Sequence, residues 1–232
     1  MVLHRLQIIY NPRMPAAKLD RSPASDQVSA VVWEMIFDGR LRSGDRVPQD
    51  EIAHHLGISR IPVREALVRL ANEGVVISKP HVGVFVAEFS PEVVRDHFQI
   101  YAQLQTLAAL RFLAGPDADS GRQTIAAIGR ELADTTDAAE VNRLSTKLAR
   151  TINVGSGSAR LRAVLRALGR MFPAELYPQI PGAMAAQQHA VALLVAAIDN
   201  GSAESIEQAC AAGGAARAEA MIDHLRQRGA FT

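Results

Sequence analysis

The chain has 232 residues, a formal net charge of +1 at pH 7 and a single cysteine. This length allows one small and one medium-sized domain, each with its own core. One cysteine, Cys210, excludes an internal disulfide framework, and no apolar run approaches membrane-spanning length, so we expect a cytoplasmic protein with no membrane partner. Because the net charge is close to zero, a nucleic-acid partner has to be argued from where the charges lie.

Residues 1–20 are expected to form a loose leader ahead of the first domain. They contain Pro12 and Pro15, and few core-forming residues follow Tyr10. The apolar stretch near the start includes Arg5 and is too short for the hydrophobic region of a secretory signal.

Two helices are predicted next. We expect Ser25 to cap the first helix and Gly39 to end it, and residues 50–56 to form a short second helix that stops at Gly57. The buried stripe of the first helix consists of Val28, Val31, Val32, Met35 and Ile36.

A third helix is predicted to begin directly after a tight turn. Ser59 can accept a bond from an N–H of the first turn, where Pro62 is tolerated, and Gly74 ends the helix. Arg60 and Arg64 are four residues apart and share the face opposite the apolar stripe. That stripe consists of Val63, Ala66, Leu67 and Leu70.

Two short β-prone runs follow, at residues 75–78 and 84–86, joined by residues 79–83. A two-stranded hairpin directly after a recognition helix forms a wing. The order helix, helix, helix, hairpin therefore predicts a winged helix-turn-helix domain, which we place at residues 21–89.

The segments 39–47, 56–67 and 73–76 resemble the GntR family of bacterial transcription regulators. The resemblance implies a sequence-specific DNA-binding regulator, by default a repressor, whose recognition helix enters the major groove. A homodimer would match the two-fold symmetry of a pseudo-palindromic operator in double-stranded DNA.

The predicted DNA contacts divide by role. Arg60 and Arg64 are candidates for base edges, because the arginine fork fits the two acceptors of guanine. Gln49 and Ser59 would donate to phosphates, and Lys79, His81 and Gly83 would bring the wing to the backbone or minor groove. The alternatives are that the arginines are ordinary solvated charges and that His81 is only a polar turn residue. His54 and His55 are interpreted as an exposed pair.

From residue 90 onward the pattern is helical. Ser90 is predicted to cap a long helix with Pro91 in its first turn. Further apolar stripes predict helices around residues 125–132, 141–152, 161–168, 191–198 and 203–225. We therefore predict a mainly α protein in which an antiparallel all-helical bundle, residues 90–232, follows the winged domain and serves for effector sensing and dimerisation.

This arrangement resembles the FadR-type branch of the family, whose C-terminal FCD domain senses small molecules. Metal-binding members carry an aspartate and a histidine four residues apart on one helix, and a histidine on each of two later helices. By resemblance, the aspartate position is Ser145 and the first histidine position is Ala149; the two later ones are His189 and a position near Gly213. Only His189 keeps a ligand type, so neither a metal nor another cofactor is expected. The family's effector-facing arginine and glutamate fall at Tyr101 and Gln105, which are also changed.

Residues 141–172 contain seven basic residues and no acidic one. The run can be a solvated surface or a site for an anionic effector, a phosphate backbone or an acidic partner, with Arg162 and Arg166 as candidate effector contacts. Asp96 and His97 are expected at the surface. The basic residues are Arg143, Lys147, Arg150, Arg160, Arg162, Arg166 and Arg170.

Two other classes of function are alternatives. An enzyme is not supported, because the chain has no glycine-rich phosphate loop, no serine nucleophile elbow and no paired-histidine metal motif. A helical interaction module with a vestigial DNA reader is the remaining alternative.

Overall fold

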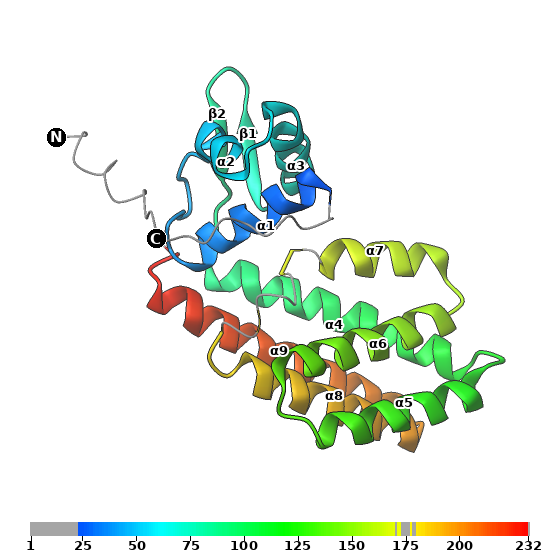
Figure 1. Cartoon of the computed structure of the whole chain (residues 1–232). Helices are drawn as coiled ribbons and strands as arrows, with labels where there is room; N and C mark the ends of the chain where they lie inside the picture. Colours follow the sequence, from blue (N-terminus) through cyan, green and yellow to red (C-terminus); the bar gives the residue numbers. More distant parts are fainter. Residues whose placement is uncertain (1–22, 170, 173–176, 178–179, 232) are drawn as a thin grey trace. The chain divides into compact units, whose positions relative to one another are not determined.

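A computed structural model describes residues 23–169, 171–172, 177 and 180–231, so the expected leader at residues 1–20 lies outside the described part. The chain divides into two compact units (Figure 1). Among the described residues, the first comprises residues 23–88 and 228–230, and the second comprises residues 89–227 and Phe231. The division falls one residue before the predicted limit of the winged domain.

Three helices build the core of the first unit: α1 (Ala24–Phe37), α2 (Gln49–Leu56) and α3 (Arg60–Asn72). The predicted stripe of α1 packs against α3, with Val28 and Val32 fully buried. Ser25 is not the cap, because the helix begins one residue earlier with Pro23 at the N-cap position. Pro23 has a non-helical conformation, with φ −50° and ψ 138°, and Ser25 lies inside the first turn. The Ser25 carbonyl accepts a bond from Arg69 Nη2 at 2.8 Å.

The wing consists of β1 (Val76–Lys79) and β2 (Gly83–Val86), which pair antiparallel. Lys79 and Gly83, predicted to lie in the connecting loop, are strand residues paired with each other. The reason is the tight turn between them, in which Val82 N donates to Lys79 O at 3.1 Å. His81 occupies the left-handed position of this turn, with φ 60°.

The described residues of the second unit include the helices α4 (Pro91–Leu113), α5 (Ala118–Ala133), α6 (Ala138–Gly155), α7 (Ala159–Gly169), α8 (Ala183–Asn200) and α9 (Ala203–Gln227). The described residues of this unit contain no strand, which confirms the predicted all-helical fold. Ser90 caps α4 as predicted, because its Oγ accepts a bond from Val93 N at 3.3 Å.

Small residues let α9 approach its neighbours closely. A Cβ atom at Gly213 would lie 2.7 Å from the Cβ of Ala190 on α8, and one at Gly214 would lie 3.1 Å from the carbonyl oxygen of Phe98 on α4. These two glycines therefore hold α9 tightly between α4 and α8 and shape the space enclosed by the bundle.

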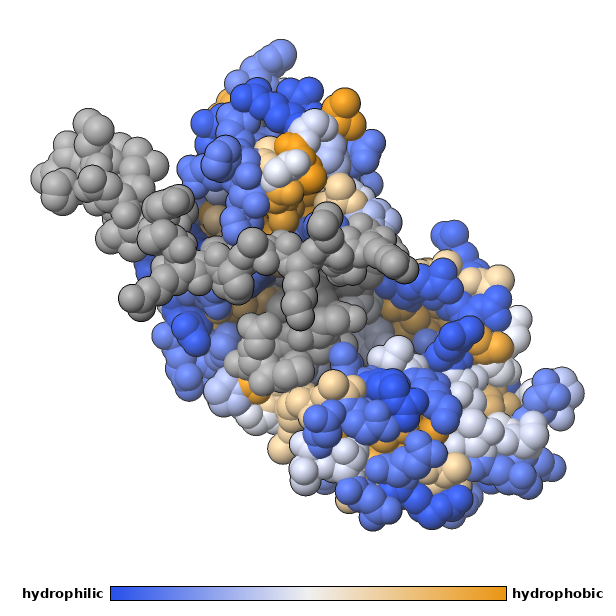
Figure 2. Space-filling model, viewed as in Figure 1, coloured by the Kyte–Doolittle hydropathy of each residue, from blue (hydrophilic) through white to orange (hydrophobic). Residues whose placement is uncertain are grey.

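Hydrophilic residues cover most of the visible surface of each unit, and hydrophobic residues are exposed in smaller areas (Figure 2). In the part of the chain that the structure describes, no helix has the length and apolar character needed to cross a membrane.

Candidate DNA interface and ligand cavity

The turn between α2 and α3 determines where the second reading helix begins. Gly57 ends α2 in the left-handed conformation, with φ 63°, and Ile58 N donates to Ala53 O at 3.0 Å. Ser59 takes the extended N-cap conformation, but its side chain makes no capping bond. The expected capping bond is therefore wrong, and the exposed Ser59 hydroxyl is left available for another acceptor or donor.

Helix α3 has a buried face and an exposed face, as its sequence predicts. Val63, Ala66, Leu67 and Leu70 are buried against the rest of the unit. Arg60 and Arg64 are both exposed on the opposite side. The sequence patterns did not single out Ile61, which is 68% exposed beside Arg60. An apolar side chain at this position could contact a thymine methyl group.

An ion pair connects the two reading helices. Arg60 Nε lies 2.8 Å from Asp50 Oδ1, and the two side chains are 68% and 70% exposed. Asp50 was not among the predicted contacts, because nothing in its local sequence shows which basic residue it meets. The pair brings the start of α2, where Gln49 is half-buried, next to the start of α3.

The wing presents a cation and a constrained turn. Lys79 Nζ lies 4.7 Å from the centroid of the Phe85 ring, and both Lys79 and His81 are exposed. Gly83 has φ 140°, and a Cβ atom there would lie 2.7 Å from Arg46 Nε. The glycine is thus required by the conformation of the wing. Arg46, a residue that the patterns did not indicate, adds an exposed cation next to the hairpin.

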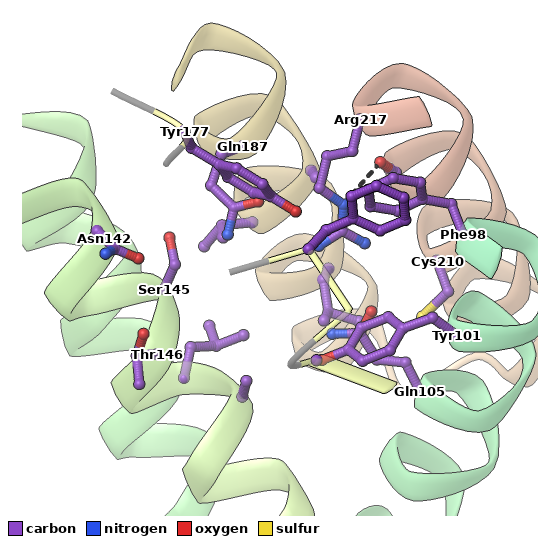
Figure 3. A pocket seen from close by; sticks show the side chains of 18 of the residues that line it. Phe98, Tyr101, Gln105, Asn142, Ser145, Thr146, Tyr177, Gln187, Cys210 and Arg217 are labelled. Carbon is purple, nitrogen blue, oxygen red and sulfur yellow. Dashed lines mark hydrogen bonds between the residues drawn. The ribbon is translucent and has the colours of Figure 1, made fainter. Parts of the chain in front are cut away.

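The second unit contains a partly open cavity of about 130 Å³. Side chains of α6 face those of α4 and α9 across it (Figure 3). Its polar lining includes His97, Tyr101, Gln105, Asn142, Ser145, Thr146, Tyr177, Gln187, Cys210 and Arg217, and its apolar lining includes Phe98, Leu148, Phe172, Val191 and Leu194.

Arg217 is the only formally charged residue in the described lining of the cavity, which contains no aspartate, glutamate or lysine. Its Nε donates to Gly213 O at 3.1 Å, and its guanidinium lies 5.9 Å from the Phe98 ring centroid and 5.8 Å from that of Tyr101. Burial and the nearby Arg217 charge lower the pKa of His97 to about 4, so His97 is neutral at physiological pH. Burial raises the pKa values of Tyr101 and Cys210.

Two polar atoms of the cavity wall lack a hydrogen-bond partner among the described residues. They are Ser145 Oγ on α6 and Gln187 Oε1 on α8, and both atoms are buried. Buried polar groups are almost always paired, so these two atoms are positions where an ordered water or a polar group of a ligand would bind.

The cavity does not fit the family's metal site. Ser145, Ala149 and Gly213 all line the wall, and none of them is a metal ligand of the histidine or carboxylate type. Gly213 has no room for a larger side chain beside Ala190. Across the described ranges, no group of three or more histidine, cysteine, aspartate or glutamate residues is placed to hold an ion.

The structure brings only part of the predicted effector set together. Tyr101 and Gln105 line the cavity, whereas Arg162, Arg166 and His189 do not. His189 is exposed, so the prediction that it contacts an effector in the bundle is wrong. Gln187 and Ala190 are the α8 residues near it that line the cavity. The expected surface position of His97 is also wrong, since its ring packs 4.8 Å from that of Phe172. His54 and His55 are exposed as predicted.

The basic run does not form one uniform surface. Arg143 Nη2 lies 2.6 Å from Glu140 Oε1 and 3.7 Å from Glu131 Oε2. Its charge is therefore neutralised in part by carboxylates outside the run. Lys147, Arg150 and Arg166 are exposed, and Arg170 lies outside the described residues.

Comparison with known proteins agrees with this geometry. The profile of the bacterial regulatory proteins of the gntR family matches residues 24–86, which span the three helices and the wing. A probable D-xylose utilization operon transcriptional repressor of Paenarthrobacter nicotinovorans is 31% identical over 155 residues, covering 66% of this chain and 68% of that protein. The chain belongs to the GntR family.

Other relatives match part of the chain. Two uncharacterized HTH-type transcriptional regulators of Mycobacterium tuberculosis are 34% identical over 148 residues, which is 64% of this chain and 60% of each relative. The chain thus spans about 60% of the length of those two relatives.

Solved structures show that the fold extends beyond the GntR profile. A GntR family member from Pseudomonas syringae is 23% identical, covers 91% of both chains and has a TM-score of 0.52. The E. coli protein McbR/YncC is 21% identical, covers 90% of this chain and 99% of its own, and has a TM-score of 0.53. At this identity the likeness concerns the fold alone.

Proposed function

We propose that this GntR chain is a sequence-specific DNA-binding regulator of transcription. The observation that carries the proposal is the exposed face of α3, where Arg60, Ile61 and Arg64 lie opposite a fully apolar buried face. The arginines would read guanine edges in the major groove, and Ile61 would contact a thymine methyl. Ser59 and Gln49 would donate to phosphates, with Lys79, His81 and Gly83 at the backbone or minor groove.

The regulator is proposed to act as a homodimer on a pseudo-palindromic operator. Two half-sites about one helical turn apart double the contact area and match a protein two-fold axis. Occlusion of a promoter is the simplest mode of action. The relative from Paenarthrobacter nicotinovorans, described as a repressor, favours this mode. A protein that acts on the chromosome works in the cytoplasm, at the nucleoid.

The second unit is proposed to be an FCD-like effector domain, as in the FadR-type branch. Support comes from the helices of its described residues and from the cavity. The cavity wall contains Tyr101 and Gln105, the positions that the resemblance assigns to effector contacts. An effector would alter DNA affinity by binding the two conformations of a dimer unequally.

A mobility-shift assay on the genomic region flanking the gene tests the function. We expect a shift that resists excess random DNA and weakens steeply with salt, because phosphate contacts release counterions. The double variant R60A/R64A should lose the shift, while R226A, an exposed arginine on α9 paired with Asp223, should keep it. A wild-type protein that binds no fragment would contradict the proposal and favour an interaction module.

A further inference from the structure

The cavity of the second unit combines one cation with unpaired polar atoms in a mainly apolar space. We propose that it binds a small organic monocarboxylate directly through Arg217, without a metal ion, and that Ser145 and Gln187 hold a hydroxyl group of the same molecule. The inference rests on the effector-responsive function proposed above. It adds the chemical class of the effector and the residues that recognise it.

Arg217 is prepared for a carboxylate. Its single hydrogen bond to the protein runs from Nε to the Gly213 carbonyl, so its terminal nitrogens have no acceptor in the described residues. The rings of Phe98 and Tyr101 pack near the guanidinium and restrict its orientation. A planar guanidinium with free terminal donors binds a carboxylate through two parallel N–H···O bonds.

Ser145 and Gln187 lie on other walls of the same cavity. Ser145 is 5% exposed, and its Oγ has no partner in the described part of the chain; the same is true of Gln187 Oε1. A ligand hydroxyl would pair both atoms, because it can accept from the serine O–H and donate to the amide oxygen. Figure 3 shows Ser145 on α6, Gln187 on α8 and Arg217 on α9, so the carboxylate and the hydroxyl would occupy different ends of the ligand.

The size and walls of the cavity limit the rest of the molecule. Its volume of about 130 Å³ is close to that of a cavity of about 150 Å³ that holds benzene, so about six to ten non-hydrogen atoms of a ligand fit inside it. Leu148, Val191 and Leu194 offer apolar contacts to the body of the ligand. A second carboxylate would be buried without a cation, since Arg217 is the only formally charged residue in the described lining.

The residues at the positions that the resemblance assigns to metal ligands do not favour recognition through a metal ion. The positions that the resemblance assigns to metal ligands are Ser145, Ala149 and Gly213 in this cavity wall, and His189 points elsewhere. Among the described lining residues, Arg217 is the positive group that a carboxylate would meet. An anion in this cavity would therefore be bound by Arg217 directly.

Calorimetry and thermal melting with defined probes test the inference. The probes are 4-hydroxybenzoate, 4-hydroxybutanoate and 5-hydroxypentanoate, which carry the carboxylate and the hydroxyl at opposite ends. Each is compared with its uncharged primary amide, in EDTA and again with added ZnCl₂. At least one carboxylate should bind in EDTA and raise the melting temperature, about tenfold or more tightly than its amide, because a charge-assisted bidentate bond is lost in the amide. Added Zn²⁺ should leave this affinity unchanged.

Three variants separate the roles of the residues. R217M should weaken the bound carboxylate about tenfold or more, and R217K should recover part of the loss, because the charge is kept but not the fork. S145A should weaken the binding of 4-hydroxybenzoate and 4-hydroxybutanoate. It should leave the binding of benzoate and butanoate, which lack the hydroxyl, unchanged. R226M, on the same helix but outside the cavity lining, is the matched control and should bind as the wild type does.

Several outcomes would overturn the inference. These are no binding by any of the three carboxylates, equal binding of a carboxylate and its amide, unchanged binding by R217M, or binding that EDTA abolishes and Zn²⁺ restores. Operator binding is measured separately on each variant. Operator binding without any carboxylate response contradicts this inference alone, whereas carboxylate binding without any DNA binding contradicts the proposed function alone.

Discussion

Arg60 and Asp50 form an ion pair at the proposed DNA-reading surface, with Nε and Oδ1 2.8 Å apart. Both side chains are largely exposed, so the pair adds little to folding stability. The ion pair instead affects orientation. In the absence of DNA, it holds the guanidinium of Arg60, a candidate base contact, at the start of helix α2. Pre-orientation of this kind favours specificity, since fewer conformations are lost on binding.

Asp50→Asn should raise affinity for random DNA and lower the ratio of operator to random affinity. The first effect follows because a carboxylate near phosphates is removed, and the second because Arg60 loses its orienting partner. The free energy of unfolding should change by less than about 0.5 kcal/mol. Both dissociation constants are measured at one salt concentration. The control is Glu51→Gln, at the exposed neighbour of Asp50 in α2, which should raise the affinities for operator and random DNA without changing their ratio. An unchanged ratio in Asp50→Asn would argue against a role of Asp50 in positioning Arg60.

Arg64→Ala should cost about 1–3 kcal/mol of operator binding and relax the preference at one base pair per half-site. The exposed position of Arg64, four residues after Arg60 on α3, gives it access to base edges in the major groove. Selection of bound sequences from a randomised pool measures the preference at each position. A variant with full affinity and an unchanged binding motif would remove Arg64 from the set of base contacts.

Lys79→Ala should weaken operator and random DNA alike and reduce the salt slope of binding by about one unit. Lys79 is exposed on the wing with its Nζ over the Phe85 ring, a position suited to phosphate contact. The slope is obtained from the dissociation constant at several salt concentrations. Lys147→Ala, an exposed lysine on α6, serves as the control and should keep the wild-type slope; an unchanged slope in Lys79→Ala would show that Lys79 does not touch phosphate.

The winged domain could be predicted from the sequence because its signals are local. Gly57 ends α2, the spacing of the apolar residues sets the buried face of α3, and Pro62 lies in the first turn of α3. Errors occurred where a turn residue was ambiguous. Pro23 replaces Ser25 at the start of α1, and the tight turn at Pro80 and His81 extends both strands by one residue toward each other.

The cavity was predicted only in part, because its residues meet through tertiary packing. Tyr101 and Gln105 were placed by resemblance, whereas Arg217 has no local motif. A signal was present nonetheless: Arg217 is a single cation after a run of alanines, glycines and one cysteine at residues 209–216. His189 was misplaced because neighbouring helix residues differ in direction by about 100°, so an error of one residue moves a side chain out of the cavity.

His97 predicts a measurable pH dependence of stability. Burial and then the Arg217 charge lower its pKa from 6.5 to about 4, and its ring packs against Phe98 and Phe172. Between these pH values the unfolded chain binds a proton that the folded chain does not, so the free energy of unfolding falls as the pH drops from about 6.5 to about 4. The loss attributable to this group is about 3 kcal/mol by the linkage relation.

His97→Gln should remove this contribution while leaving the remaining pH dependence, which comes from other groups. Urea unfolding at pH 7, 5.5 and 4.5 measures the difference between variant and wild type. Helical circular dichroism should be followed, because the single tryptophan, Trp33, lies in α1 of the other unit and does not report on the bundle. His189→Gln controls for the loss of a surface histidine. Equal slopes for wild type and His97→Gln over this range would mean that His97 titrates in the folded protein as it does in the unfolded chain, and that its burial beside Arg217 does not keep it neutral.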